Sequence, residues 1–207
     1  MPENLHKLFV ISSPSGGGKT SLINKLFEDS RSANFKKSIS DTSRQKRQGD
    51  LEGKDYYFLS EKDFKDKINK EEYVEYATVF GNFYGTSKEE IKTKYNNSNL
   101  ILELDWQGAY AVKELFDDAK LIFLVPPSLD DLKQRLIKRN LDSSKEIESR
   151  LSEAKKEISK SEMYDYLVLN DDFHKAFEDL SQILFEGISP MDFNSRASKD
   201  LIKRLVE

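Results

Sequence analysis

A glycine-rich stretch near the N-terminus constrains this chain more than any other part of it. Residues 12–21 read Ser-Ser-Pro-Ser-Gly-Gly-Gly-Lys-Thr-Ser, between an apolar run at residues 8–11 and a segment with apolar residues at 22, 23, 26 and 27. A strand, a glycine-rich loop and a helix in this order are typical of a phosphate-binding loop. Backbone N–H groups of such a loop point inward at phosphate oxygens, and the helix adds its positive end.

The loop predicts a site for a nucleoside triphosphate. Lys19 would reach the β- and γ-phosphates, and the Thr20 hydroxyl would help to hold Mg²⁺. Ser13 stands where the usual pattern has glycine, which suits a serine only if the backbone there does not need a positive φ. The alternative is a flexible glycine linker before an unrelated helix. The placement of Lys19 and Thr20 between strand and helix favours the phosphate loop.

Composition narrows the class of protein. The 207 residues suit one α/β unit, and 33 Lys and Arg against 37 Asp and Glu give a net charge of −4, which argues against a general nucleic-acid binder. The absence of cysteine excludes disulfides and thiolate metal sites. We see no signal peptide and no long apolar span, so we expect a cytoplasmic protein without a membrane partner.

The order of the expected elements indicates an α/β fold. Strands at residues 100–104, 121–125 and 166–169 alternate with helices, which is typical of a mostly parallel sheet flanked by helices. Residues 36–86 interrupt this alternation as a small strand-rich insert, within which residues 41–54 show no apolar period and are expected to form an exposed loop. A highly charged helix at 142–160 has only a thin apolar stripe, which marks it as a candidate mobile lid.

The insert carries side chains suited to a second substrate. Arg44 and Arg47 can bind phosphate bidentately, although a solvated loop remains the alternative for them. Glu75 lies on an expected strand among aromatic residues, where a carboxylate can accept two N–H groups from a guanine edge. Asp105 follows a buried strand, at the end where open α/β sheets bind ligands, and its alternative role is to cap the next helix.

Seven short motifs follow one another along the chain: Ser-Pro-Ser-Gly-Gly-Gly-Lys-Thr at 13–20, Ser-Asp-Thr-Ser-Arg-Gln-Lys-Arg at 40–47, Gly-Lys-Asp-Tyr at 53–56, Gly-Asn-Phe-Tyr-Gly-Thr at 81–86, Leu-Asp-Trp-Gln-Gly at 104–108, Pro-Pro-Ser at 126–128 and Asn-Asp-Asp at 170–172. By these motifs and their order the chain resembles the guanylate kinase family, from about Lys7 to Phe185. The resemblance implies a P-loop NTPase fold with an inserted mixed β lobe that binds GMP, and a helical lid.

It also implies an activity, the Mg²⁺-dependent transfer of the ATP γ-phosphoryl group to GMP and, less well, to dGMP. By the family pattern the GMP phosphate would be held by Arg44, Arg47, Tyr56 and Tyr84. The guanine would be read by Ser40, Glu75, Thr86 and Asp105. ATP would be bound by Ser13, Pro14, Ser15, Gly16, Gly17, Gly18, Lys19, Thr20, Ser21, Arg135, Arg139 and Asn170, the last near adenine. The catalytic cations would be Lys19, Arg44, Arg135 and Arg150.

The resemblance further implies a single domain with a core at 5–35, 87–138 and 161–207, a GMP-binding lobe at 36–86 and a lid at 139–160. Two departures from the pattern concern Thr86, where many members have serine, and Asn140-Leu141, which replace glycine and threonine in the lid. The expected partners are ATP and GMP, with no nucleic acid. A monomer and a homodimer both remain open, as does the role of the polar tail at 189–207.

Two other functions are compatible with parts of the pattern. A guanylate-kinase-like interaction module would bind a partner without catalysis, but such modules lose the phosphate loop that Lys19 and Thr20 preserve here. A related phosphate-loop kinase could act on another phosphorylated acceptor. Glu75 together with Ser40 and Thr86 argues for guanine, provided that the three side chains converge in the fold.

Overall fold

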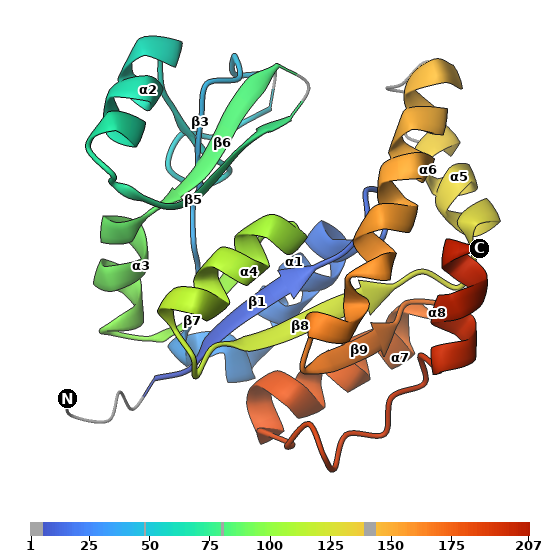
Figure 1. Cartoon of the computed structure of the whole chain (residues 1–207). Coiled ribbons are helices and arrows are strands. Elements are labelled where there is room, and N and C mark those ends of the chain that lie inside the picture. The colour runs from blue at the N-terminus through green and yellow to red at the C-terminus, as the bar shows by residue number, and fades with distance from the viewer. Residues whose placement is uncertain (1–5, 48, 80, 139–143) are drawn as a thin grey trace. The chain divides into compact units, whose positions relative to one another are not determined.

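The computed structural model describes residues 6–47, 49–79, 81–138 and 144–207 (Figure 1). The chain separates into two compact units. The first unit comprises Met1–Val10 and Asn34–Ala119, and the second comprises Ile11–Ala33 and Lys120–Glu207. The proposed division into a core, a GMP-binding lobe and a lid stays a prediction.

Five strands form the larger sheet in the order β2-β7-β1-β8-β9. Strand β2 (Phe35–Lys37) pairs in parallel with β7 (Asn99–Glu103), and β8 (Lys120–Val125) pairs in parallel with β9 (Tyr166–Leu169). Every residue of β1 (Leu8–Ser12) is buried. Apolar runs without alternation are typical of parallel strands covered on both faces, so the predicted α/β architecture is confirmed.

The first unit also contains a separate four-stranded sheet in the order β4-β3-β6-β5. Its strands are β3 (Asp41–Thr42), β4 (Tyr57–Phe58), β5 (Tyr73–Val79) and β6 (Asn82–Ser87). Strands β5 and β6 are antiparallel, whereas β3 and β4 are parallel, so this sheet is mixed as predicted. The helices of the unit are α2 (Glu61–Asn69), α3 (Lys88–Tyr95) and α4 (Trp106–Leu115).

The expectation of an exposed loop over residues 41–54 is wrong for its first two residues, which form strand β3. Asp41 and Thr42 are buried, and the Thr42 hydroxyl donates to the carbonyl of Phe83 at 2.9 Å. Asp41 accepts a hydrogen bond from the Tyr73 hydroxyl at 2.8 Å and one from Lys67 at 2.5 Å. Polar residues such as Asp41 and Thr42 are buried only where they have hydrogen-bond partners. These partners are distant in the sequence, and polar residues add nothing to an apolar pattern, so the sequence did not indicate the burial.

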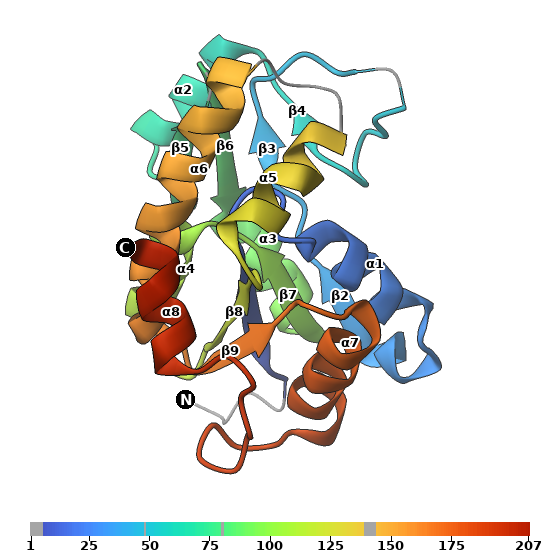
Figure 2. The ribbon, with the colours of Figure 1, turned by 90° about the vertical axis from the view of Figure 1, so that its right-hand side faces the viewer.

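The second unit is built from β8, β9 and five α-helices among the described residues (Figure 2). These helices are α1 (Lys19–Glu28), α5 (Leu129–Lys138), α6 (Ser144–Ser159), α7 (Phe173–Ser181) and α8 (Lys199–Val206). Helix α7 packs against β9 and α1, and α6 packs against both α5 and α8. The expected lid helix is therefore α6, while residues 139–143 of the expected lid lie outside the described residues.

Candidate active site

The phosphate loop joins β1 to α1 in the conformation that its glycines allow. Gly18 precedes the first residue of α1 with φ 88°, in the left-handed region, and has no side chain to cap the helix. The amide of Gly17 donates to the carbonyl of Pro14 at 2.8 Å, which closes the turn. The loop therefore ends at a helix N-terminus, where backbone amides and the helix dipole favour an anion.

Ser13 occupies its glycine position without backbone strain. Among the described residues other than glycine, only Glu71 has a positive φ. Ser13 is buried, and its hydroxyl donates to the carbonyl of Pro14 at 3.2 Å. A Cβ atom on Gly17 would lie 2.8 Å from the Ser13 Cβ, so the serine is accommodated because residue 17 is glycine.

Two side chains from elsewhere in the second unit donate hydrogen bonds to this loop, and a third holds one of these two residues. The Asn170 amide nitrogen donates to the carbonyl of Gly17 at 2.7 Å, and Arg135 on α5 donates to the carbonyl of Asn170 at 2.9 Å. Arg150 on α6 donates to the Ser15 hydroxyl at 2.9 Å. The structure thus brings Asn170 and Arg150 into contact with the phosphate loop, and Arg135 into contact with Asn170.

The remaining predicted ATP residues lie on the loop itself or outside the described part of the chain. Lys19 and Thr20 are the first two residues of α1, and Ser21 follows them in the first turn. Arg139 lies outside the described residues. Together with Arg135 and Arg150, Lys19 makes the surroundings of the loop positively charged, which suits a polyphosphate.

In the first unit, a second set of predicted residues converges on β5 and β6. Glu75 pairs with Thr86 across these strands and accepts hydrogen bonds from its hydroxyl and its amide. The hydroxyls of Thr86 and Ser40 lie 3.3 Å apart. Asp105 caps α4 by accepting from the Gly108 amide at 2.9 Å. Asp105 therefore does cap the helix, which was the alternative role for this residue. Its negative charge also contributes to raising the pKa of Glu75.

The environment of Glu75 perturbs its ionisation. The pKa of Glu75 is raised to about 7, mainly because the side chain is buried and to a lesser degree because of the nearby Asp105 carboxylate, while the hydrogen bonds from Thr86 act in the opposite direction. Gly108 leaves room for this carboxylate, because a Cβ there would lie 3.2 Å from the Cγ of Glu75. A carboxylate with a strongly raised pKa beside a second carboxylate is typical of a functional site.

The predicted acceptor-phosphate residues form an aromatic and cationic group in the same unit. The Arg44 guanidinium lies 5.4 Å from the ring centre of Tyr56, and the rings of Tyr56 and Tyr84 meet edge to face at 5.7 Å. Arg44 also pairs with Asp50 at 2.9 Å. Arg47 contacts this group through its backbone amide, which donates to the same Asp50 oxygen at 2.7 Å. Arg47 as a whole is exposed.

Asp50 was not among the predicted site residues, although its sequence position offers a signal. An aspartate three residues after Arg47 can accept from the amide of Arg47, as in many turns. The Arg47 amide and the Arg44 guanidinium hold the pKa of Asp50 below its ordinary value. Asp50 therefore links the side chain of Arg44 to the backbone of Arg47 and orients the Arg44 guanidinium.

The eight predicted GMP residues thus lie in the first unit, and the described ATP residues lie in the second. Among the described residues, no group of three or more His, Asp or Glu is arranged to hold a metal ion. The same ranges contain no helix of the length and apolarity that a bilayer span requires.

Comparison with known proteins gives one consistent result. The family model for guanylate kinase matches residues 5–187. A guanylate kinase of Wolbachia sp. subsp. Brugia malayi is 46% identical over 184 residues, covering 88% of this chain and 93% of the relative. One from Hahella chejuensis is 47% identical over 178 residues, covering 86% of this chain and 85% of the relative.

A solved structure agrees with these relatives. The crystal structure of guanylate kinase from Anaplasma phagocytophilum matches with a TM-score of 0.71 and 32% sequence identity. The match covers 99% of this chain and 95% of the other. The phosphate loop, the mixed sheet with its carboxylates and these matches lead to the same conclusion: the chain belongs to the guanylate kinase family.

Proposed function

We propose that this protein transfers the γ-phosphoryl group of ATP to GMP, giving ADP and GDP, and that dGMP is a poorer acceptor. The observation that carries the proposal is the convergence of Ser40, Glu75, Thr86 and the nearby Asp105 in one unit. Hydroxyls and carboxylates at this site suit a base that presents several N–H donors. Membership of the guanylate kinase family supports the same substrate pair.

Glu75 supplies the discrimination between guanine and adenine. Ionised, its carboxylate accepts from the N1–H and the exocyclic N–H of guanine, whereas adenine presents an acceptor at N1. A site built around such a pair rejects the wrong base because a buried polar group is then left unpaired. Thr86 orients the carboxylate through two hydrogen bonds, and Ser40 and Asp105 complete the set.

Arg44, Arg47, Tyr56 and Tyr84 bind the GMP phosphate in this proposal. Arg44 is stacked against Tyr56 and paired with Asp50, so its planar guanidinium is already oriented before the phosphate arrives. A guanidinium held in this way binds a phosphate bidentately with little further loss of side-chain entropy. The two tyrosine hydroxyls add neutral hydrogen bonds at the same position.

The phosphate loop binds the ATP phosphates through the amides of residues 13–18 and through Lys19 and Ser21. Arg135, Arg139 and Arg150 neutralise the triphosphate and the group in transfer, and Asn170 lies toward the adenine. The hydrogen bond from Arg150 to Ser15 and the one from Asn170 to Gly17 support this assignment for two of them.

The residues present fit a magnesium ion that comes with the nucleotide. Mg²⁺ commonly keeps several waters and takes few protein ligands when phosphates supply the rest. Thr20 offers one hydroxyl in the first turn of α1, and the described residues hold no cluster of acidic ligands. When bound, the ion neutralises charge on the β- and γ-phosphates.

The reaction needs no general base, because the GMP phosphate is itself an anionic nucleophile. The protein has to align two polyanions and offset their mutual repulsion, which is severe in a site that excludes water. Lys19, Arg44, Arg135 and Arg150 supply the positive charge, and positioning supplies much of the remaining rate enhancement. Closure of the proposed lid at 139–160 over both substrates would limit hydrolysis of ATP.

The deciding experiment is an ADP-release assay with ATP and Mg²⁺ and each of GMP, dGMP, AMP, UMP, CMP and dTMP as acceptor. We expect strong turnover with GMP and weaker turnover with dGMP. Lys19→Ala is the control variant and should lower the rate with GMP about a thousandfold, by analogy with the loss of an arginine finger. Turnover on another base would contradict the proposed specificity, and GMP binding without any turnover would indicate an interaction module.

We place this activity in purine nucleotide metabolism and in the cytoplasm, where ATP and GMP are available. The assigned residues of the GMP site lie in the first unit, and the described residues of the ATP site lie in the second. A monomer and a homodimer are both compatible with this proposal.

A further inference from the structure

The C-terminal segment 189–207 contains a contact that the family match does not include. The match ends at residue 187, and the segment after it has no motif of its own. The segment nevertheless contacts β9 closely. The Ser195 hydroxyl donates to the carbonyl of Leu167 at 2.5 Å, and the amide of Ala197 donates to the Ser195 oxygen at 3.2 Å. These contacts place Arg196 beside the end of β9.

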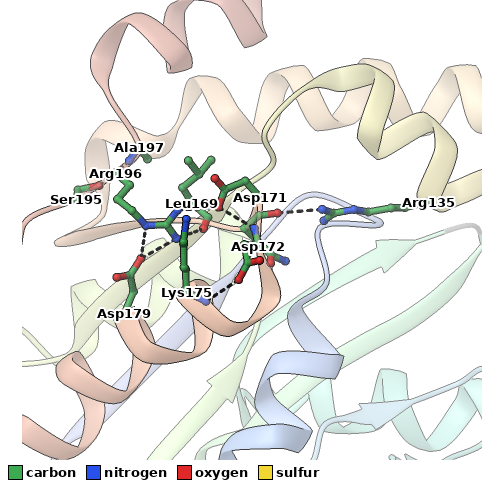
Figure 3. A network of polar contacts seen from close by, with 10 residues as sticks. Arg135, Leu169, Asp171, Asp172, Lys175, Asp179, Ser195, Arg196 and Ala197 are labelled. Atoms are coloured by element: carbon green, nitrogen blue, oxygen red, sulfur yellow. Dashed lines mark hydrogen bonds and ion pairs between the residues drawn. The ribbon is translucent and has the colours of Figure 1, made fainter.

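All three nitrogens of the Arg196 guanidinium donate hydrogen bonds, to the end of β9, to the turn that follows it and to helix α7 (Figure 3). Its Nη1 donates to Asp171 at 2.7 Å, and its Nη2 donates to the carbonyl of Leu169 at 2.9 Å and to Asp179 at 3.1 Å. Its Nε also reaches Asp179, at 3.3 Å. One side chain therefore connects the last residue of β9, the turn after it and helix α7.

Asn170 lies in this turn, directly between two residues that Arg196 contacts. Its backbone amide donates to the carbonyl of Val125 at 2.8 Å, which continues the pairing of β8 and β9. Its side chain donates to the carbonyl of Gly17 in the phosphate loop, and its own carbonyl accepts from Arg135. A displacement of the turn would therefore move two members of the proposed ATP site.

We propose that Arg196 is a positioning residue for the ATP site: by holding Leu169 and Asp171 it fixes Asn170, which in turn fixes the phosphate loop at Gly17 and the side chain of Arg135. The inference rests on the proposed function, because it assumes that Asn170 and Arg135 serve ATP. It assigns to the C-terminal segment a part in nucleotide binding that lies outside the family match.

The electrostatics of the turn agree with a fixed geometry. The hydrogen bond from Arg196 lowers the pKa of Asp171, and the adjacent backbone amides lower it as well. Asp179 differs, because its burial raises its pKa against the nearby charge of Arg196. Arg196 thus holds one carboxylate at the surface and one that is largely withdrawn from water. A lysine has a single ammonium group and cannot match this forked set of acceptors.

A second contact of the same segment is consistent with the inference. Helix α8 packs beside α6, as both views show. Helix α6 carries Arg150, which donates to Ser15 of the phosphate loop. The segment after residue 187 therefore supports the phosphate loop by two routes, through Asn170 and through α6.

The test is steady-state kinetics of Arg196→Gln with ATP and GMP varied separately. We expect the KM for ATP to rise roughly fivefold to tenfold, the size of coupling usual between hydrogen-bonded neighbours, and the KM for GMP to stay within twofold. Calorimetric titration with ADP should show the same loss of affinity without turnover. Arg196→Lys should recover only part of the loss.

The matched control is Arg31→Gln. Arg31 belongs to the same unit and pairs with Asp29 at 2.7 Å and with Glu186 at 4.0 Å, but it has no contact with the turn after β9 among those described. Its loss should lower the melting temperature and leave the KM for ATP unchanged. An equal effect of both variants on the KM for ATP would overturn the inference.

Two further variants separate the inference from the proposed function. Asp171→Asn removes one partner of Arg196 from an exposed position, and its effect on the KM for ATP should be less than additive with that of Arg196→Gln. Asn170→Ala should raise the KM for ATP by itself. If Asn170→Ala has this effect and Arg196→Gln and Asp171→Asn have none, the inference is wrong and the proposed ATP site stands. If none of the three has an effect, the inference and the assignment of Asn170 to ATP are both wrong, whereas the phosphoryl transfer measured in the same assay stands.

Discussion

The two proposed nucleotide sites, one in each unit, are built from different chemical groups. In the second unit the phosphate loop presents backbone amides, and the side chains around it, such as Asn170 and Arg150, hold the loop. In the first unit the proposed guanine site consists of side chains, with Glu75, Thr86 and Ser40 as its polar groups. A backbone site recognises charge and shape, which all triphosphates share, whereas a side-chain site recognises one base.

The difference predicts where each site is vulnerable. A loop built from amides fails when an added atom displaces the backbone, even if no polar group is lost. A site built from side chains fails when one acceptor becomes a donor, even if no atom moves. Each of the three predictions that follow alters one unit and uses the KM for the other nucleotide as the reference.

The largest effect is expected from Gly17→Ala in the phosphate loop. The new Cβ would lie 2.8 Å from the carbonyl oxygen of Pro14 and 2.8 Å from the Cβ of Ser13, so the loop has to shift. Removal of a single preorganised donor can cost about a hundredfold to a thousandfold in rate, and we expect kcat/KM for ATP to fall by that order. The KM for GMP should stay within about twofold.

Ser13→Gly provides the control and a route to rescue. Alone it should change kcat/KM for ATP by less than about threefold, because Ser13 sits without strain. Combined with Gly17→Ala it removes the Ser13 Cβ and Oγ, two of the three atoms nearest to the new methyl group, and should restore part of the activity. A double variant as inactive as Gly17→Ala would show that the contact with Pro14 alone displaces the loop.

This contrast also explains what the sequence could predict. The phosphate loop is local, so ten consecutive residues with their flanking strand and helix were enough to predict its course and the helix that starts at Lys19. The guanine group draws on residues 40, 75, 86 and 105, and the register of β5 with β6 decides which of them meet. The family resemblance, and no spacing rule, assigned these four residues to one site.

Two features escaped prediction for a physical reason. Asp41 is a buried carboxylate with partners on β5 and α2, and nothing in its neighbourhood in the sequence marks it as buried. Arg196 stands in a polar segment without periodicity, and its partners lie 17 to 27 residues earlier in the chain. Pairwise contacts between polar residues leave no apolar pattern, so only the folded chain reveals them.

The second prediction concerns the recognition of the base in the first unit. Glu75→Gln keeps the shape of the side chain but places an NH₂ group where the carboxylate would accept from guanine. Loss of a charged hydrogen-bond acceptor costs about 1.5–3 kcal/mol, so we expect kcat/KM for GMP to fall about a hundredfold and the ratio of GMP to AMP turnover to fall with it.

Thr86→Ser is the matched control for this variant. It retains the hydroxyl that hydrogen-bonds Glu75 and should change kcat/KM for GMP by less than about threefold. The KM for ATP should not respond to either substitution, because no assigned ATP residue is altered. Unchanged selectivity in Glu75→Gln would remove Glu75 from the guanine site.

The smallest expected effect is a pH dependence that belongs to the first unit alone. The pKa of Glu75 is raised to about 7 by burial, so near neutral pH part of the protein carries the protonated acid, which cannot accept from two guanine N–H groups. As the pH falls below 7, the KM for GMP should rise by up to about tenfold per pH unit. The KM for ATP should follow a different and flatter profile.

Glu75→Gln separates this titration from that of the GMP phosphate, whose second pKa lies near 6. The variant retains only the contribution of the phosphate, so the difference between the two profiles isolates Glu75.

The stability of the protein gives an independent check of the Glu75 pKa, and the sign of the expected effect is definite. Because the folded-state pKa of Glu75 is above its ordinary value of 4.5, the folded state binds the proton more tightly, and this contribution to stability is lost as the pH rises toward 7. The melting temperature of Glu75→Gln relative to the parent protein should therefore increase from pH 5 to pH 8, by an amount equivalent to at most about 3 kcal/mol. A constant difference across that range would show that Glu75 titrates normally, and the site would then discriminate guanine without the raised pKa that distinguishes this buried carboxylate from the groups of the phosphate loop.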